Sequence, residues 1–412
     1  MKSAEYMGIL IIGAGHCGGR VVQYLREDGF QGRIDLVGDE LSAPYERPPL
    51  SKDVLIGTKR LDELDLMPSD VMEGLRVNRH IASVLSIESK LNTAKLSNGE
   101  VLHYDALLFA NGGTPRLLNI PGEDLPQVMA LRNKDDALRL SAHLKEGQRI
   151  VIIGGGFIGL EVAASAYKLG CKVTLIEGGS QLMGRAVPKL IADRAYTAHL
   201  DKGIDLRIGV SPLQIEKENS HLTVALSDGT TVPADAVVVG IGIVPNIEIA
   251  KTAGITTARG ILVDSQLRTS VTNIFAAGDV AEFPSPISGT LVRQETWQNA
   301  ESQARVVATN LLGGHEKFHS SSWFWSDQHE YQLQVSGEPS AGLSWVVREQ
   351  EDGDVIVFYL DDKNKIVGAS GWGLTSRITK DLKIARILVE RGVVATGDVL
   401  SNPETKLKFL LK

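Results

Sequence analysis

The sequence predicts an α/β protein in which one strand–turn–helix unit occurs twice and a smaller α+β domain follows. An apolar strand at residues 9–12 runs directly into a GxGxxG pattern at 13–18, and residues 149–159 repeat this arrangement. In both copies a helix-like stretch and a second apolar strand come next, and an Asn-Gly or Asp-Gly hairpin signal later leads into a closing strand. From residue 323 onward, short alternating strands and an amphipathic helix at 378–389 take over. We therefore expect two Rossmann-like dinucleotide-binding domains and a C-terminal α+β domain.

Composition excludes several other classes of protein. Glycine accounts for 42 of 412 residues, about 10% against the usual ~7%, which is typical of a chain with many tight turns. The net charge of −7 argues against a nucleic-acid binder, and two cysteines exclude a disulfide scaffold or a four-thiolate zinc site. The nine histidines show no metal-ligand spacing, so no metal is expected. No apolar run reaches the ~20 residues of a membrane span, and no signal peptide is recognisable, so we expect a cytoplasmic protein.

The two glycine patterns predict two nucleotide sites. The first glycine of each permits a tight turn, the second lets the backbone approach a pyrophosphate, and the third lets the helix pack close to the strand. The helix N-terminus then offers free N–H groups to the phosphates. These glycines are Gly13, Gly15 and Gly18 in the first copy, and Gly154, Gly156 and Gly159 in the second.

An acidic residue about 20 positions further on is expected to bind a ribose hydroxyl. Asp39, with Glu40 as its alternative, and Glu177 each follow an apolar strand. A carboxylate accepts from a free 2′-hydroxyl and repels a 2′-phosphate, and the residues after Glu177 are not basic. We therefore expect one site to hold a flavin dinucleotide and the other to read NADH in preference to NADPH.

Several longer segments carry a family resemblance. Residues 44–52 (PYERPPLSK), 154–161 (GGGFIGLE), 273–280 (NIFAAGDV), 293–300 and 323–328 (WFWSDQ) stand in the order found in one family. The chain resembles the FAD-dependent, NADH-oxidising ferredoxin reductases of bacterial oxygenase systems, whose fold is glutathione-reductase-like. The resemblance implies an FAD-binding domain in two parts, at 1–112 and 243–318. It also implies an NAD-binding domain between these parts, at 113–242, and a C-terminal α+β domain at 319–412.

The resemblance also implies cofactor contacts and a reaction. Flavin contacts would be made by Gly15, Cys17, Asp39, Lys52, Val84, Arg132, Asp279 and Trp297, with Ile158, Glu161 and Gly242 as further cofactor-binding candidates. Hydride would pass from NADH to FAD, with Lys52 and Glu161 as an ion pair beside the flavin; without the resemblance, both would be ordinary helix residues. Asn111 departs from the family, which usually has threonine there.

The implied partner is a [2Fe–2S] ferredoxin that serves an oxygenase. Ferredoxins are acidic, so we expect docking near Trp325 and Arg305. Other acceptors, such as rubredoxin or monodehydroascorbate, and an NADH-sensing flavoprotein are the alternatives. A disulfide reductase is disfavoured because Cys17 and Cys171 form no CxxC pair. Cys171 is expected to be a packing residue. The helix N-terminus would favour a lowered pKa for Cys17, but a nucleotide phosphate would occupy that position.

Overall fold

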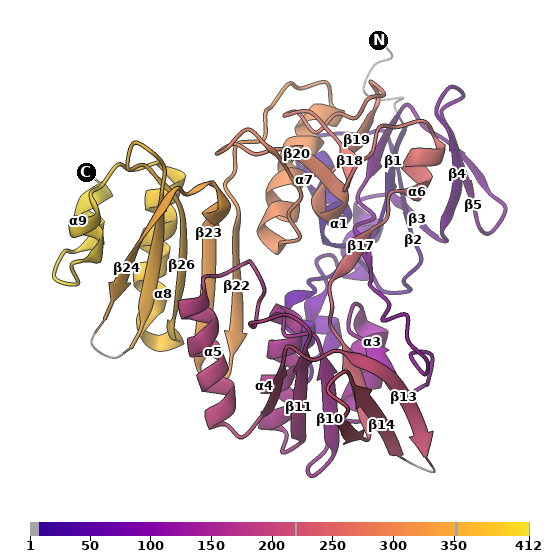
Figure 1. The fold of residues 1–412 in the computed structure, drawn as a ribbon. Helices are drawn as coiled ribbons and strands as arrows, with labels where there is room; N and C mark the ends of the chain where they lie inside the picture. Colours follow the sequence, from indigo (N-terminus) through magenta and orange to yellow (C-terminus); the bar gives the residue numbers. More distant parts are fainter. Residues whose placement is uncertain (1–7, 219–220, 351–352, 412) are drawn as a thin grey trace. The chain divides into compact units, whose positions relative to one another are not determined.

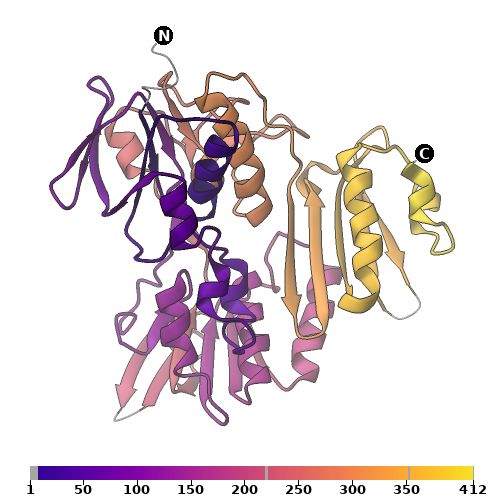
Figure 2. The same ribbon diagram turned by 180° about the vertical axis from the view of Figure 1, so that it is seen from behind.

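The computed structural model describes residues 8–218, 221–350 and 353–411, and they form two compact units (Figures 1 and 2). Unit 1 comprises Met1–Glu46, Leu64–Thr114 and Val244–Trp323, and unit 2 comprises Arg47–Glu63, Pro115–Ile243 and Phe324–Lys412. The strands β8 (Gly113–Pro115) and β17 (Ile243–Pro245) lie where the chain passes from one unit to the other. Within the described ranges, no helix is both long enough and apolar enough to cross a membrane.

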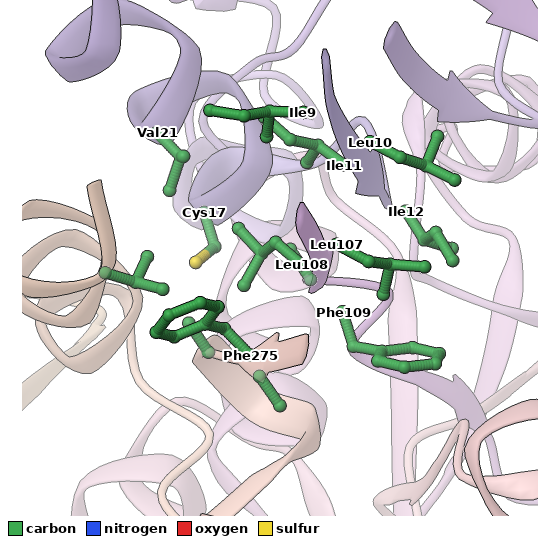
Figure 3. Packing of buried hydrophobic residues seen from close by; sticks show 14 of the residues in the cluster. Ile9, Leu10, Ile11, Ile12, Cys17, Val21, Leu107, Leu108, Phe109 and Phe275 are labelled. Atoms are coloured by element: carbon green, nitrogen blue, oxygen red, sulfur yellow. The ribbon is translucent and has the colours of Figure 1, made fainter. Parts of the chain in front are cut away.

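Unit 1 is built on a parallel sheet of short strands, of which all but the edge strand Val77–Ile81 are almost wholly buried, as expected when both faces of a sheet are covered. In spatial order the strands are β19 (Ile274–Ala276), β7 (Ala106–Phe109), β1 (Gly8–Ile12), β2 (Arg33–Gly38) and β3 (Val77–Ile81). The helices α1 (His16–Glu27) and α7 (Trp297–Leu311) pack against each other. Figure 3 shows Cys17 and Val21 of α1 facing the same apolar core as Leu108 of β7 and Phe275 of β19.

Smaller elements complete unit 1. A three-stranded antiparallel sheet carries the predicted Asn98-Gly99 turn between its second and third strands. These strands are β4 (Val84–Glu88), β5 (Thr93–Leu96) and β6 (Val101–His103). The remaining elements are α2 (Ser69–Gly74), α6 (Glu248–Thr252), β18 (Ile261–Leu262), η4 (Gly278–Val280), β20 (Ala281–Pro284) and β21 (Leu291–Val292).

Unit 2 repeats the same plan. Its parallel sheet runs β12 (Asp205–Ile208), β11 (Lys172–Glu177), β10 (Arg149–Ile153), β16 (Ala236–Val239) and β9 (Val128–Ala130). The helices are α3 (Lys134–Ser141), α4 (Phe157–Lys168) and α5 (Lys189–Asp201). The antiparallel sheet β13 (Pro212–Glu218), β14 (His221–Leu226) and β15 (Thr231–Ala234) carries the second predicted hairpin turn. The duplication expected from the glycine patterns is therefore present in the fold.

The C-terminal part of unit 2 is a five-stranded sheet with a helix on it, as the sequence predicts. The strands are β22 (Trp323–Gln328), β23 (Tyr331–Gly337), β26 (Ile366–Leu374), β25 (Val355–Leu360) and β24 (Ser344–Glu349), in spatial order. Helix α8 (Thr375–Glu390) packs on β23 and β26. The short elements are η5 (Pro339–Ala341), α9 (Gly397–Ser401) and η6 (Leu407–Leu411), together with η2 (Pro48–Ser51) and η3 (Leu61–Leu64) near the start of the chain.

One placement differs from the expected division of the chain. Residues 47–63, expected within the first part of the FAD-binding domain, group with unit 2 because η2 packs on α4. The four segment boundaries stay a prediction.

The C-terminal residues are anchored by Arg348 of β24. Its side chain is 4% exposed, and its guanidinium donates to the backbone carbonyls of Leu400, Asn402, Pro403 and Thr405. Because a buried guanidinium needs several acceptors, these bonds tie the end of the chain to the sheet.

Candidate active site

The glycine turn of unit 1 has the geometry that a dinucleotide requires. Gly13 has φ of 112°, a backbone conformation that side chains rarely adopt, and a Cβ there would lie 2.3 Å from the carbonyl oxygen of Ala110. A Cβ on Gly18 would lie 2.0 Å from the carbonyl oxygen of Gly13. Gly15 is the N-cap of α1, and no side chain caps the free N–H groups there. These groups stay available to a phosphate, so the turn fits a pyrophosphate.

The glycine turn of unit 2 has nearly the same backbone geometry as that of unit 1. Gly154 has φ of 110°, and a Cβ on Gly159 would lie 2.0 Å from the carbonyl oxygen of Gly154. Gly156 is the N-cap of α4, again without a side-chain cap. Ile158 on the first turn of α4 is 44% exposed, and Gly242 is exposed with φ of 95°. This turn therefore fits a second dinucleotide.

Glu177 is held rigidly at the end of β11. Its Oε2 accepts from the backbone N–H of Gly155 at 2.7 Å, and its Oε1 accepts from that of Gly179 at 2.6 Å. The carboxylate is thus fixed beside the glycine turn, with further lone pairs available for hydroxyl donors. This placement supports the prediction that Glu177 reads the ribose of a nicotinamide dinucleotide.

The other predicted flavin contacts are divided between the two units. In unit 1, Asp39 is exposed directly after β2, Val84 is buried at the start of β4, and Asp279 lies in η4. Trp297 begins α7, with its ring centroid 5.2 Å from that of His16. In unit 2, the N–H of Arg132 donates to Asp136 at 2.9 Å and its carbonyl accepts from Arg47 at 2.5 Å.

The two cysteines are buried and free, one in each unit. Burial raises the pKa of the Cys17 thiol far above its ordinary value, and the negative charges of Asp279 and Glu301 add to the rise. Burial and these charges therefore outweigh any lowering of this pKa by the helix N-terminus. Cys171 donates to the carbonyl of Lys145 at 3.3 Å, and burial raises its pKa as well.

Asn111, the departure from the family pattern, is part of a reciprocal pair. Its amide donates to the carbonyl of Asn246 at 2.9 Å, and the amide of Asn246 donates back to the carbonyl of Asn111 at 2.8 Å. The asparagine thus joins two chain segments of unit 1, a role that the shorter threonine side chain cannot fill with an amide donor.

A buried ionic cluster in unit 2 contains both predicted catalytic residues. Pro48 and Pro49 start η2, which delivers Lys52 to a position where only 15% of its side chain is exposed. The Lys52 ammonium lies 3.3 Å from Glu161 and 2.8 Å from Asp327. It is also 5.4 Å from the centroid of the Trp325 ring.

Electrostatics favour the charged form of Lys52 in this cluster. Burial by itself lowers the pKa of Lys52, but Glu161 and Asp327 outweigh burial and the net shift is upward. Burial raises the pKa of Glu161 above its ordinary value, and Lys52 together with the hydroxyls of Ser51 and Ser326 offsets only part of that rise. Lys52 is therefore a fixed cation between two carboxyl groups.

Sequence reasoning missed three members of this cluster. Asp327 accepts from Lys52, from Trp325 Nε1 at 3.1 Å and from Gln332 at 2.8 Å. Ser51 and Ser326 donate to Glu161 at 2.5 and 2.7 Å. The available signal was their presence in two of the family-like segments, although nothing in either segment indicates that the two meet.

The predicted docking residues have structural partners. Trp325 is half-buried and its indole N–H is bound to Asp327. Arg305 of α7 forms a two-pronged ion pair with Asp28 at 2.7 and 2.8 Å and lies 5.0 Å from the ring centroid of Tyr24. The hydrogen bond to Asp28 raises the pKa of Arg305. Arg305, which was expected to serve docking, thus also holds α1 and α7 together.

Two glycine turns with uncapped helices, a carboxylate fixed beside one of them and an ionic cluster are the features of a two-nucleotide oxidoreductase, and comparisons with known proteins identify its family. A family model described as pyridine nucleotide-disulphide oxidoreductase matches residues 7–304, and a reductase C-terminal model matches 323–411. The chain belongs to the pyridine nucleotide-disulphide oxidoreductase family. Proteins of this family use FAD and NAD(H), so the predicted cofactor pair, enzyme class and fold class are confirmed.

Individual relatives narrow the group. The chain is 39% identical to the ferredoxin–NAD(+) reductase component of the p-cumate 2,3-dioxygenase system of Pseudomonas putida, over 97% of each chain. It is 38% identical to rhodocoxin reductase of Rhodococcus erythropolis, over 98% of this chain and 94% of that one. Putidaredoxin reductase, solved in a covalent complex with putidaredoxin, matches with a TM-score of 0.93 at 31% identity, covering 98% of each chain. The family resemblance inferred from sequence is confirmed.

Proposed function

We propose that the protein passes electrons from NADH through FAD to an acidic [2Fe–2S] ferredoxin. That ferredoxin would supply a bacterial oxygenase, either a Rieske-type enzyme or a cytochrome P450. The observation that carries the proposal is the combination of two nucleotide turns with two buried cysteines that belong to different units. Such a chain lacks the close dithiol of a disulfide reductase and needs an external acceptor. The relatives named above support a ferredoxin in that role. The proposal takes the cytoplasm, where NADH is available, as the site of action.

In this proposal the turn of unit 1 holds FAD and the turn of unit 2 holds NADH. Residues proposed to contact FAD are Gly13, Gly15, Cys17, Gly18, Asp39, Lys52, Val84, Arg132, Asp279 and Trp297. Residues proposed for the nicotinamide dinucleotide are Gly154, Gly156, Ile158, Gly159, Glu177 and Gly242. When bound, FAD accepts a hydride from NADH and releases the two electrons singly to a one-electron acceptor.

The proposed role of the ionic cluster is electrostatic. Lys52 stays charged because Glu161 and Asp327 stabilise its ammonium. A fixed cation favours the development of negative charge nearby during hydride transfer, and it needs no reorganisation to do so. Glu161 keeps Lys52 in place, while Asp327 binds both Lys52 and the Trp325 indole.

Matched alanine substitutions test the assignment of the two turns. In each turn the new Cβ would lie 2.0 Å from a backbone carbonyl oxygen, so the local distortion is the same. Gly18→Ala should release FAD and give a pale protein. Gly159→Ala should keep its yellow colour and its FAD content but raise the KM for NADH. The opposite pattern would show that the two turns are assigned the wrong way round, and FAD binding to neither turn would contradict the proposal.

Docking of the ferredoxin is proposed at Trp325 and Arg305. Arg305→Gln and Asp28→Asn break the same ion pair, so they perturb α1 and α7 alike. If Arg305 also binds the partner, only Arg305→Gln should raise the KM for ferredoxin, and the effect should shrink at high salt because the Debye length is only ~8–10 Å. Equal effects of the two variants would reduce Arg305 to a structural residue.

Trp325→Ala should lower ferredoxin-dependent turnover more than ferricyanide reduction, because a small oxidant needs no docking surface. The control is stopped-flow reduction by NADH, which should be less affected than partner turnover. If ferredoxin, rubredoxin and monodehydroascorbate all fail to reoxidise the NADH-reduced protein, a sensing flavoprotein replaces the reductase as the function.

A further inference from the structure

A continuous line of hydrogen bonds in unit 2 ends at Glu161 and begins at a pair of histidines. Ser326 donates to Glu161 Oε1 at 2.7 Å, and Gln328 Nε2 donates to Ser326 Oγ at 3.2 Å. His199 Nε2 lies 3.1 Å from Gln328 Oε1, and His329 Nε2 lies 3.1 Å from His199 Nδ1. The groups come from β22, from the residue that follows it, from α5 and from α4, so the line exists only in the folded protein.

The direction of every bond in this line follows from its last member. A carboxylate can only accept, so the Ser326 hydroxyl donates to Glu161 and its oxygen accepts from the Gln328 amide. The Gln328 carbonyl oxygen then requires a donor, which places the proton of His199 on Nε2. His199 Nδ1 is left as an acceptor and takes the Nε2 proton of His329. All donors therefore point toward Glu161.

Burial strengthens these hydrogen bonds, so their common direction affects the charge of Glu161. Ser326, Gln328 and His199 are fully buried, and Glu161 is 4% exposed. In such surroundings hydrogen bonds are stronger, and each one polarises the next. A line of donors with one sense stabilises negative charge at its end, and that end is the carboxylate paired with Lys52.

We infer that His199 is a positioning residue that acts through Gln328 and Ser326 to hold Glu161 as a carboxylate for Lys52. No proton is transferred in this role; the imidazole fixes the amide orientation, and the amide fixes the hydroxyl. The effect on Glu161 is independent of the proposed function, whereas any effect on hydride transfer rests on the proposed role of the Lys52–Glu161 pair.

Among the described residues, charged groups lie near the two ends of the line. His329 faces Glu330 and Lys202, which pair with each other at 3.0 Å, and its ring packs edge-on against Tyr167. His199 faces His329, while Glu161 faces Lys52. Lys52 is thus the only one of these charged groups in direct contact with Glu161, so a change transmitted from His199 must pass through Gln328 and Ser326.

Two substitutions at one position separate an effect that passes along this line of hydrogen bonds, called the relay below, from an effect of packing alone. His199→Gln keeps an amide N–H that can donate to Gln328, whereas His199→Phe keeps a ring but has no donor. The ionisation of Glu161 is followed in the FAD-loaded protein by the infrared carbonyl band of the protonated carboxyl, assigned by its loss in Glu161→Gln. His199→Phe should shift this titration upward in pH, by about threefold or more in the ionisation constant, while His199→Gln should shift it less.

A double substitution tests whether the effect passes along the line. Ser326→Ala removes the bond to Glu161 itself and should give the larger shift. Adding His199→Phe to Ser326→Ala should then cause no further shift, because the line is already cut. Full additivity, or equal shifts for the Phe and Gln variants, would overturn the inference. If His199→Phe does not fold, Gln328→Met interrupts the same line, and the same outcomes apply.

The pH dependence of the flavin midpoint potential is measured on the same samples. If the Glu161 titration moves and this pH dependence moves with it, the relay and the proposed role of the Lys52–Glu161 pair both stand. If the titration moves alone, the relay stands and the electrostatic role of the pair fails.

Discussion

His199 and His329 should make the stability of unit 2 fall as the pH drops below neutrality. Burial, together with the neighbouring His329, lowers the pKa of His199 from 6.5 to about 4. Between these values the unfolded chain binds a proton that the folded protein does not, so stability rises with pH across this window. The stabilisation is complete above about pH 6.5 and is lost as the pH falls toward 4.

The size of the effect follows from the same values. One pKa unit corresponds to about 1.4 kcal/mol, and pH 5 lies about 1.5 units below the unfolded pKa. At pH 5, His199 should therefore lower the free energy of unfolding by about 2 kcal/mol relative to neutral pH. Burial also lowers the pKa of His329 to about 4, but this ring is partly exposed and should add less.

His199→Gln isolates this contribution, because glutamine keeps a donor for Gln328 and does not titrate in this range. Urea unfolding of the FAD-loaded wild type and variant, compared at about pH 7.5 and pH 5, gives the difference, since the titrations of groups that the substitution leaves unchanged cancel. The wild type should lose about 2 kcal/mol more than the variant between the two pH values. Equal losses would show that His199 does not resist protonation in the folded protein, and the argument from burial would be wrong.

Three further substitutions have defined outcomes. Glu177→Arg should raise the KM for NADH and narrow the preference over NADPH in steady-state assays, and a wild type that already prefers NADPH would contradict our interpretation of this carboxylate. Arg348→Met leaves carbonyl groups near residues 400–405 without their donor, so the free energy of unfolding should fall by about 2–4 kcal/mol. A protease should also cut the C-terminus sooner, and an unchanged cleavage rate would refute the anchoring role. Asn111→Thr should lower the unfolding free energy by about 1 kcal/mol through loss of the bond to Asn246, and denaturant unfolding measures it; a variant as stable as the wild type would mean that the reciprocal pair contributes nothing.

Local sequence was sufficient wherever a structure depends on neighbouring residues. A tight turn at Gly13 or Gly154 needs a positive φ, and the residue that allows it occupies the turn itself. The hairpin turns and the C-terminal helix were predicted for the same reason, since each reflects turn chemistry or the spacing of apolar residues over one element. The family and its cofactors followed from several such segments in order.

The properties of Cys17 and Arg305 depend on the side chains packed around them, which their local sequence does not reveal. Cys17 stands at a helix N-terminus, which by itself favours the thiolate, but the core around it raises the pKa instead. Arg305 carries a charge suited to an acidic partner, yet Asp28 already binds it. In both cases the residue type and its element were known, and the missing information was what packs against the side chain.

By itself, the sequence determined the duplicated fold, the two nucleotide turns and the acid that follows each second strand, because these are properties of short continuous segments. The partners in the ionic cluster were decided only by the tertiary structure: Lys52 meets Asp327 across 275 positions, and Ser51 meets Glu161 across 110. His329 likewise reaches His199 across 130 positions. The physical reason is that burial and hydrogen-bond partners are set by how whole elements pack, and the ionisation of Lys52, Glu161 and His199 depends on those partners far more than on their neighbours in the chain.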